Sequence, residues 1–230
     1  MQITAIKHLL EPLTAEEIAT AVSIVRLKKS VGAPFRFPCV TLHEPEKSAV
    51  LAFQTGDPID REAFLLLLDN ATGYTYEAIV DLTRGTVVSW QHIPQVQPNI
   101  MADELAECEA AVKAHPDFRA ALAKRGIIDL DLVVDAPWAI GNFGFKEEEG
   151  IRLSRCLCYL CAISGGNFYS RPIDGLVPVV DLNKMEVLRI EDQGSVTIPA
   201  EPGEYARAFV SKFRDDLKPL QITQPEGPSF

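Results

Sequence analysis

The sequence predicts an α+β fold of two domains, each a helix packed on an antiparallel sheet, followed by a C-terminal connector. Three observations predict it. A helix with a capping motif precedes a series of short extended segments joined by short turns. The same order of elements begins again after residue 100. From residue 199 onward, frequent prolines disfavour regular structure.

The first domain is expected over residues 1–95. Thr14-Ala15-Glu16-Glu17 is a capping box, in which the threonine side chain accepts from a free backbone N–H and Glu17 reaches back, so a helix is expected over about 14–29. Short extended runs are expected within 40–53, split by a turn at 44–47. Further strands are expected at 64–68, 75–81 and 86–93. Their short connections allow only antiparallel neighbours.

The second domain is expected over residues 96–200. It begins with a helix, because apolar side chains recur on one helical face: Met101, Leu105, Cys108 and Val112. His115-Pro116 ends this helix, and a shorter second helix closes at Gly126. Extended segments follow near 131–138, 151–163, 174–182 and 186–192. Asp81-Leu82 and Asp181-Leu182 stand in similar contexts a hundred residues apart, which suggests that the two domains are alike.

The connector is expected over residues 201–230. Prolines recur along it, and they leave only one short amphipathic stretch, from Tyr205 to Leu217. The closing residues 224–230 cannot form a helix and carry nothing that would cap a domain.

Composition and charge argue against a membrane protein and against a nucleic-acid-binding protein. The 230 residues are 47% hydrophobic and 23% charged, and no stretch approaches the length of apolar sequence that a membrane span needs. The net charge is -10, and an acidic surface repels a phosphate backbone. Neither nucleic acid nor a membrane is therefore an expected partner. With no leader peptide visible, a cytoplasmic protein is expected.

The five cysteines are an odd number and do not form a disulfide framework, which indicates a reducing compartment. Cys156, Cys158 and Cys161 are close enough in sequence to suggest a metal site. The same segment also fits a strand that places Cys156 and Cys158 on one face and Cys161 on the other. Small buried hydrophobic residues are therefore favoured over metal ligands.

No histidine or serine in the sequence has the spacing of a catalytic or metal centre. None of the four histidines pairs with another as His-x-His or His-x-x-x-His. Neither Gly-x-Ser-x-Gly nor Ser-x-x-Lys occurs. The run Lys146-Glu147-Glu148-Glu149 is expected to be a solvated surface.

Four strings together resemble the copper- and topaquinone-containing primary amine oxidases. They are Pro12-Leu13-Thr14-Ala15-Glu16-Glu17, Gly85-Thr86-Val87-Val88-Ser89-Trp90, Arg171-Pro172-Ile173-Asp174-Gly175-Leu176 and Ile222-Thr223-Gln224-Pro225-Glu226-Gly227-Pro228-Ser229-Phe230. The resemblance covers about residues 10–230, and the last phrase, in this order after the other three, is highly specific.

The resemblance is to the two small N-terminal domains of that family, N2 and N3, each a helix packed on an antiparallel sheet in the cystatin-like manner. In the family, the proline-rich phrase leads directly into a large β-sandwich that holds the active site and forms the dimer. The resemblance therefore implies a non-catalytic part of an amine oxidase that is inactive alone. Its expected partner is that β-sandwich, in the same chain or in a separate polypeptide.

The resemblance also implies where the cofactors are. The family makes its quinone from a tyrosine in an Asn-Tyr-(Asp/Glu) setting and holds copper with a His-x-His pair and a distant histidine. None of the five tyrosines here follows an asparagine, and no His-x-His pair is present. Copper and topaquinone are expected only in the catalytic domain. No catalytic residue and no metal ligand are assigned in this chain.

Complete enzymes of the family convert a primary amine, oxygen and water into an aldehyde, ammonia and hydrogen peroxide. By alignment with the family's channel wall, Leu105, Trp138 and Tyr169 are expected to line the channel by which the amine enters. Leu105 also fits the core stripe of its helix. The alternative is a free-standing cystatin-like binding or dimerisation module without redox activity. Such a module would enclose a pocket, whereas a domain pair without its sandwich would expose a large apolar patch.

Overall fold

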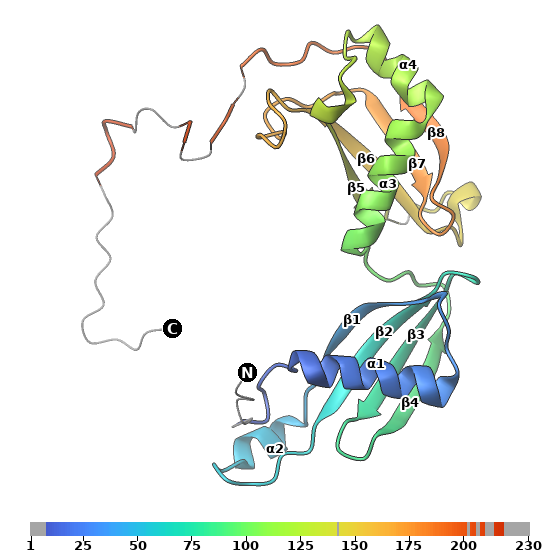
Figure 1. Cartoon of the computed structure of the whole chain (residues 1–230), viewed down its shortest axis with the longest axis vertical. Coiled ribbons are helices and arrows are strands. Elements are labelled where there is room, and N and C mark those ends of the chain that lie inside the picture. Colours follow the sequence, from blue (N-terminus) through green and yellow to red (C-terminus); the bar gives the residue numbers. More distant parts are fainter. Residues whose placement is uncertain (1–7, 142, 202, 206–207, 210–213, 219–230) are drawn as a thin grey trace.

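The chain forms two α+β units that follow one another along the sequence (Figure 1). The computed structural model describes residues 8–141, 143–201, 203–205, 208–209 and 214–218. The final string of the resemblance, residues 222–230, lies outside these residues, as does part of the expected amphipathic stretch. Among the described residues, no helix has the length and apolar character to cross a membrane.

The first unit is one helix on a four-stranded antiparallel meander. Its strands are β1 (Phe35–His43), β2 (Glu62–Asp69), β3 (Tyr74–Asp81) and β4 (Thr86–Ile93), in the order β1-β2-β3-β4. The helix α1 (Ala15–Lys29) crosses one face of this sheet (Figure 1). Its buried Ala21 and Val25 pack with Leu65, Leu67 and other inward side chains of the sheet.

The second unit repeats this plan with two helices. These are α3 (Ala102–Ala114) and α4 (Pro116–Lys124), followed by the 3-10 turn η1 (Leu130–Leu132). The strands are β5 (Val133–Ala139), β6 (Leu153–Leu160), β7 (Leu176–Asp181) and β8 (Glu186–Asp192), again in sequential antiparallel order. A second 3-10 turn, η2 (Lys146–Glu148), lies between β5 and β6. The predicted α+β class and the predicted helix–strand order are confirmed.

The prediction for residues 40–53 was wrong in part. The strand β1 begins at Phe35, and residues Lys47–Ala52 form the short helix α2. Pro38 fits inside β1 because this strand is at the edge of the sheet, and its register shifts between Arg36 and Cys39. Past the end of β1 the backbone has no strand to pair with, so it satisfies its own groups, as in the Ala49 N–H donating to Glu46 at 2.9 Å.

Each unit contains an ion pair between a buried arginine and a glutamate in the first turn of a helix. In the first unit, Arg61 donates to the carboxylate of Glu17, in the first turn of α1, at 2.9 Å. In the second, Arg152 donates to Glu104, in the first turn of α3, at 2.8 Å. The leucine of each Asp-Leu pair also binds the arginine of its unit. The Leu82 N–H donates to the Arg61 carbonyl, and the Leu182 N–H donates to the Arg152 carbonyl.

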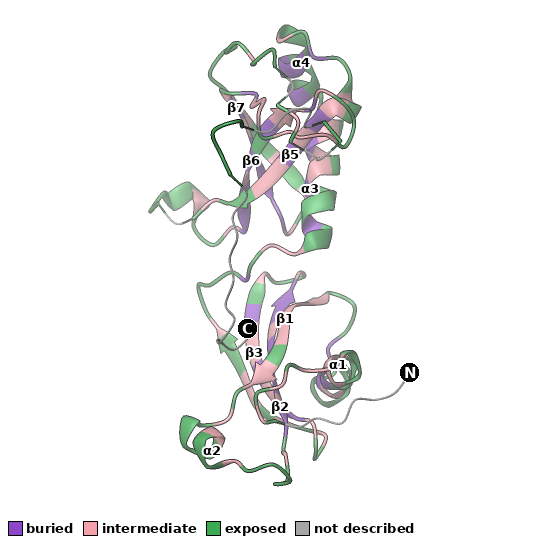
Figure 2. Cartoon of the chain, turned by 90° about the vertical axis from the view of Figure 1, so that its left-hand side faces the viewer, coloured by how far each residue is buried: buried purple, intermediate pink, exposed green. Residues whose placement is uncertain are grey.

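The two hydrophobic cores have no buried residue in common. Figure 2 shows buried residues inside each unit and mostly exposed or half-buried residues between the units. The described polar contacts between them include Arg36, which lies 3.4 Å from Asp103 and 3.3 Å from Glu107. Each unit therefore has its own core.

Candidate functional site

The face of the second sheet that points away from α3 is lined by alternate residues of β5 and β6. Pairing of the two strands places Val134 opposite Tyr159, Ala136 opposite Leu157, and Trp138 opposite Arg155. We call these six side chains the outer face. Successive side chains of a strand alternate between its two faces. The residues between those of the outer face therefore point toward α3 and are buried there: Val133, Asp135, Cys156 and Cys158.

Trp138 and Tyr169 lie at the two ends of this outer face. Trp138, at the end of β5, is 57% exposed. Tyr169 is 60% exposed and packs edge-on against Tyr159, with ring centroids 5.6 Å apart. Val134, which lies opposite Tyr159, is four positions from Trp138 along β5. At the usual rise per residue, the two ends are about 13 Å apart. The exposed Leu157 lies between them, so the face presents apolar and aromatic surface to solvent.

Leu105 does not belong to the outer face. It follows Glu104 on α3, on the opposite side of the sheet, near the end where Ala139 pairs with Ser154. Its side chain is 38% exposed, whereas Cys108 and Val112 on the same helix are fully buried. The alternative placement of Leu105 in the core stripe is therefore wrong. The structure brings Trp138 and Tyr169 to one face of the sheet and places Leu105 on α3, which covers the opposite face.

The loop that carries Tyr169 is held by the start of the connector. The carboxylate of Glu204 accepts from the Asn167 N–H at 3.0 Å, and the guanidinium of Arg171 donates to the Pro199 carbonyl at 3.0 Å. Phe168 packs against Tyr169 in a tilted arrangement, with ring centroids 4.2 Å apart. Burial, followed by the nearby Tyr169, raises the pKa of Tyr159 above its ordinary value of 10. Phe168 and Tyr159 complete this aromatic group, and no sequence motif singles them out, although their aromatic character is a signal.

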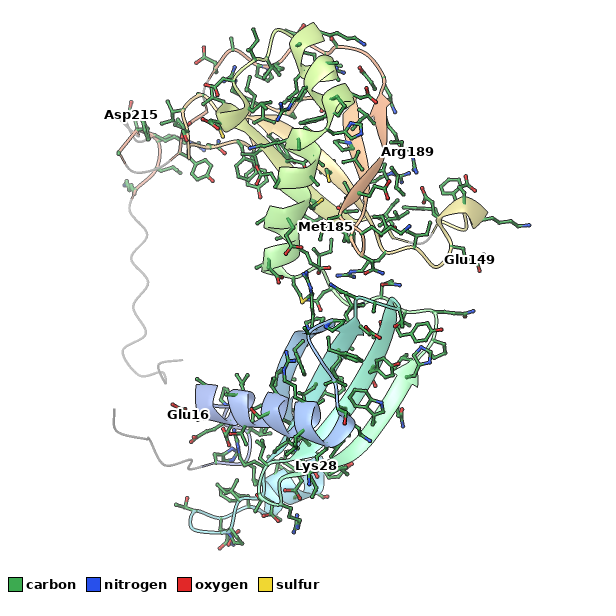
Figure 3. All side chains as sticks on the ribbon, turned by 45° about the vertical axis from the view of Figure 1, so that its right-hand side comes forward. Glu16, Lys28, Glu149, Met185, Arg189 and Asp215 are labelled. Carbon is green, nitrogen blue, oxygen red and sulfur yellow. The ribbon has the colours of Figure 1, made fainter. Side chains whose placement is uncertain are left out.

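A charged network covers the remainder of this side of the sheet. Glu148 lies 2.7 Å from Arg189 and 3.5 Å from Arg155, and Glu191 lies 3.0 Å from Arg189. Figure 3 shows Arg189 and Glu149, next to η2, on this side of the unit. Hydrogen bonding to Glu148 raises the pKa of Arg189 above its ordinary value. The expectation that the run 146–149 is wholly solvated is wrong for Glu148, whose side chain is 11% exposed.

The histidines do not fit the copper site of the resembled family. His43 lies 2.8 Å from Glu62, and His92 packs on Tyr74 with centroids 4.5 Å apart. His8 and His115 belong to other segments of the chain. In the described part of the chain, the one group of three or more His, Cys, Asp or Glu residues close enough to share a metal ion contains no histidine. No step of copper chemistry is therefore assigned to these residues.

Two surface hollows of about 320 and 290 Å³ lie on the first unit. The first is lined only by residues of α1, so it has a single wall. The second lies between the start of α1 and the turn after β3, around Arg61. Neither is lined by Leu105, Trp138 or Tyr169. The predicted residues thus belong to an exposed surface.

The fold defines a pair of α+β domains, each with helical cover on a four-stranded antiparallel sheet. Two family models match these units in order: the AGAO-like N2 domain over residues 14–90 and the copper amine oxidase N3 domain over residues 103–209. The chain belongs to the copper amine oxidase family and comprises its N-terminal N2 and N3 domains. The resemblance found in the sequence is confirmed.

Named relatives support the same assignment. The chain is 42% identical over 229 residues to a primary amine oxidase of Arthrobacter sp. (strain P1), covering 99% of this chain and 35% of that protein. It is 37% identical over 267 residues to the peroxisomal diamine oxidase 1 of Nicotiana tabacum, covering 97% and 34%. The chain therefore spans about a third of the length of these relatives.

A solved structure shows the same fold. A copper-containing benzylamine oxidase from Hansenula polymorpha superimposes with a TM-score of 0.71 at 23% identity. The match covers 96% of this chain and 37% of that chain. Both units of the present chain therefore correspond to one part of a larger oxidase fold.

Proposed function

We propose that this chain supplies scaffold and substrate-channel wall to a copper amine oxidase that converts a primary amine, oxygen and water into an aldehyde, ammonia and hydrogen peroxide. The observation that carries the proposal is the ordered match of both units to N2 and N3, joined to an exposed aromatic face on the second unit. The proposed partner is the remaining two thirds of such an oxidase. Copper and the quinone are proposed to be held there, because the one metal-sized group among the described residues contains no histidine and no tyrosine of the sequence follows an asparagine.

Trp138 and Tyr169 are the proposed wall residues that meet the amine or the neighbouring domain. Both are large aromatic side chains with more than half of their surface exposed, and both are held by neighbouring structure. Rigid aromatic surface excludes water and selects substrates by shape. Leu105 is a proposed wall residue on α3, on the opposite side of the sheet. Its position allows it to contact a different part of the entrance.

The hollows favour this proposal over a free-standing binding module. A module that holds a small apolar ligand needs an enclosed pocket, and the two surface hollows described above lack enclosing walls. The second unit instead exposes several large apolar side chains, which are Trp138, Phe143, Phe145, Leu157 and Tyr169. An exposed set of this kind is typical of a surface that contacts another domain.

We also propose domain limits of 1–95 and 96–200, with the connector over 201–230. The end of β4 at Ile93 and the start of α3 at Ala102 support the first limit. Ile198 still packs on the second core, which supports the second. The five free cysteines support a reducing compartment, such as the cytoplasm.

A chimera tests the proposal. The present chain would replace the corresponding region of the Arthrobacter sp. (strain P1) oxidase, to which it is 42% identical. We expect the chimera to oxidise methylamine, whereas the chain alone with copper releases no peroxide. Trp138→Ala and Tyr169→Ala should change kcat/KM and the preference between methylamine and a bulkier amine, at unchanged copper content.

Tyr74→Ala is the matched control, because Tyr74 is half exposed but lies on the first unit. Its kinetic constants should equal those of the unaltered chimera. Equal effects of all three substitutions would refute the wall assignment. Peroxide release by the chain alone would refute the non-catalytic role.

A further inference from the structure

A cluster of sulfur and carboxylate groups lies inside the second unit, between α3 and the sheet. Cys108 of α3, Asp135 of β5 and Cys156 of β6 each offer one ligand atom, and these atoms all lie within 4.8 Å of one another. The three residues are at most 2% exposed. Cys158, also buried, lies next to them, with its Sγ 3.5 Å from Asp135 Oδ1.

One carboxylate oxygen of Asp135 is buried without a hydrogen-bond partner. Its Oδ1 accepts from the Cys158 thiol, but Oδ2 is buried without a hydrogen bond. A buried carboxylate oxygen left unpaired costs free energy comparable to a lost hydrogen bond or more. A cation beside Oδ2 would compensate this cost.

The spacing of the donors fits a tetrahedral cation. The Sγ atoms of Cys108 and Cys156 are 3.7 Å apart. With zinc–sulfur bonds of about 2.3 Å, the edge between two sulfurs of a tetrahedron is about 3.8 Å. Sulfur ligands with one carboxylate suit a borderline-soft cation such as Zn²⁺ and do not suit Mg²⁺ or Ca²⁺.

We propose that Cys108, Cys156 and Asp135 form a buried zinc-binding site in the second unit, and that Cys158, which donates to Asp135 Oδ1, positions this carboxylate. The site ties α3 to β5 and β6, so its role is structural. Binding releases the thiol protons to solvent. Because the ligands are buried, the metal enters while the unit folds. The proposal goes beyond the oxidase role and does not depend on it.

Refolding with and without metal tests this site. The full chain would be unfolded in a reductant and a chelator, then refolded with or without Zn²⁺. Native mass spectrometry should find one Zn²⁺ per chain, and the thermal midpoint should rise. Cys156→Ser and Asp135→Asn should abolish the bound metal, and Cys158→Ala should weaken its affinity at least tenfold. Cys39→Ser is the matched control, because Cys39 lies in the other unit, and it should bind as the unaltered chain does.

A spectroscopic measurement on the unaltered chain guards against variants that fail to fold. Refolding with Co²⁺ in place of Zn²⁺ should give the strong visible bands of tetrahedral Co²⁺ and thiolate-to-cobalt charge transfer in the near ultraviolet. Absence of stoichiometric metal, absence of the thiolate bands, or unchanged binding in Cys156→Ser would each overturn the proposal.

Discussion

Arg152 is almost completely buried because its guanidinium meets acceptors on several sides. Glu104 accepts two of its hydrogen bonds, and the carbonyls of Pro98 and Asn99 accept the others. Removing one partner of such a pair leaves an uncompensated buried charge. We therefore expect Glu104→Ala to lower the free energy of unfolding by about 3–5 kcal/mol, measured by urea denaturation of the full chain.

Glu107→Ala on the same helix is the control for this prediction. Glu107 pairs with Arg36 at 3.3 Å, but its side chain is 46% exposed. Exposed ion pairs contribute about 1 kcal/mol or less, so the loss should stay below that value. A similar loss in both variants would show that burial does not set the strength of the pair.

Glu17 makes the stability of the first unit depend on pH. Burial raises the pKa of Glu17, but hydrogen bonds from Arg61 and from the Thr14 N–H outweigh it, so the pKa lies below its ordinary value of 4.5. The folded state therefore binds this proton less tightly than the unfolded state. The stabilisation is complete above about pH 4.5 and is lost as the pH falls through the lowered pKa.

Glu17→Gln should remove this dependence. We expect the difference in urea midpoint between the unaltered chain and the variant to be largest near neutral pH and to shrink below about pH 4. A difference that stays constant over the acidic range would contradict the pKa assignment.

At the scale of single elements, the capping box begins α1. The Thr14 hydroxyl accepts from the Glu17 N–H at 3.2 Å, and Glu17 accepts from the Thr14 N–H at 2.8 Å. We expect Thr14→Ala to cost about 1 kcal/mol of unfolding free energy, because a helix N–H loses its partner. Urea denaturation measures this loss.

Thr20→Ala is a matched control in the same helix. The Thr20 hydroxyl bonds to the Glu16 carbonyl within the helix, which already has its own backbone partner. Alanine is the better helix former, so this substitution should be neutral or slightly stabilising. Equal losses at positions 14 and 20 would show that the cap is not what begins the helix.

At the scale of the whole molecule, the separate cores predict separate responses to core mutations. Val25 on α1 and Val112 on α3 are both fully buried, in different clusters. Truncating either to alanine should cost about 2 kcal/mol. In hydrogen exchange, Val25→Ala should reduce protection in β2 and β3 and leave β6 unchanged. Val112→Ala should do the reverse, and loss of protection in both units from either variant would contradict independent folding.

Local sequence signals determined the elements of this protein. The capping box at Thr14, the Pro116 that begins α4 and the glycines after the strands act over a few residues, so the sequence could show them. The short turns dictated antiparallel neighbours for the same reason. Residues 47–52 were predicted to be partly extended but form α2, because the local sequence does not show whether a strand has a neighbouring strand to pair with.

Long-range packing decided the rest. Cys108 and Cys156 are 48 residues apart, and only the docking of α3 on β6 brings their sulfurs together. The alternation of β5 fixed which side Trp138 occupies, whereas the fold of the 161–175 loop placed Tyr169 on that same side. The docking of α3 placed Leu105 on the opposite side of the sheet. Sequence patterns report the preferences of neighbouring residues, whereas contacts between distant segments depend on how whole elements pack against one another.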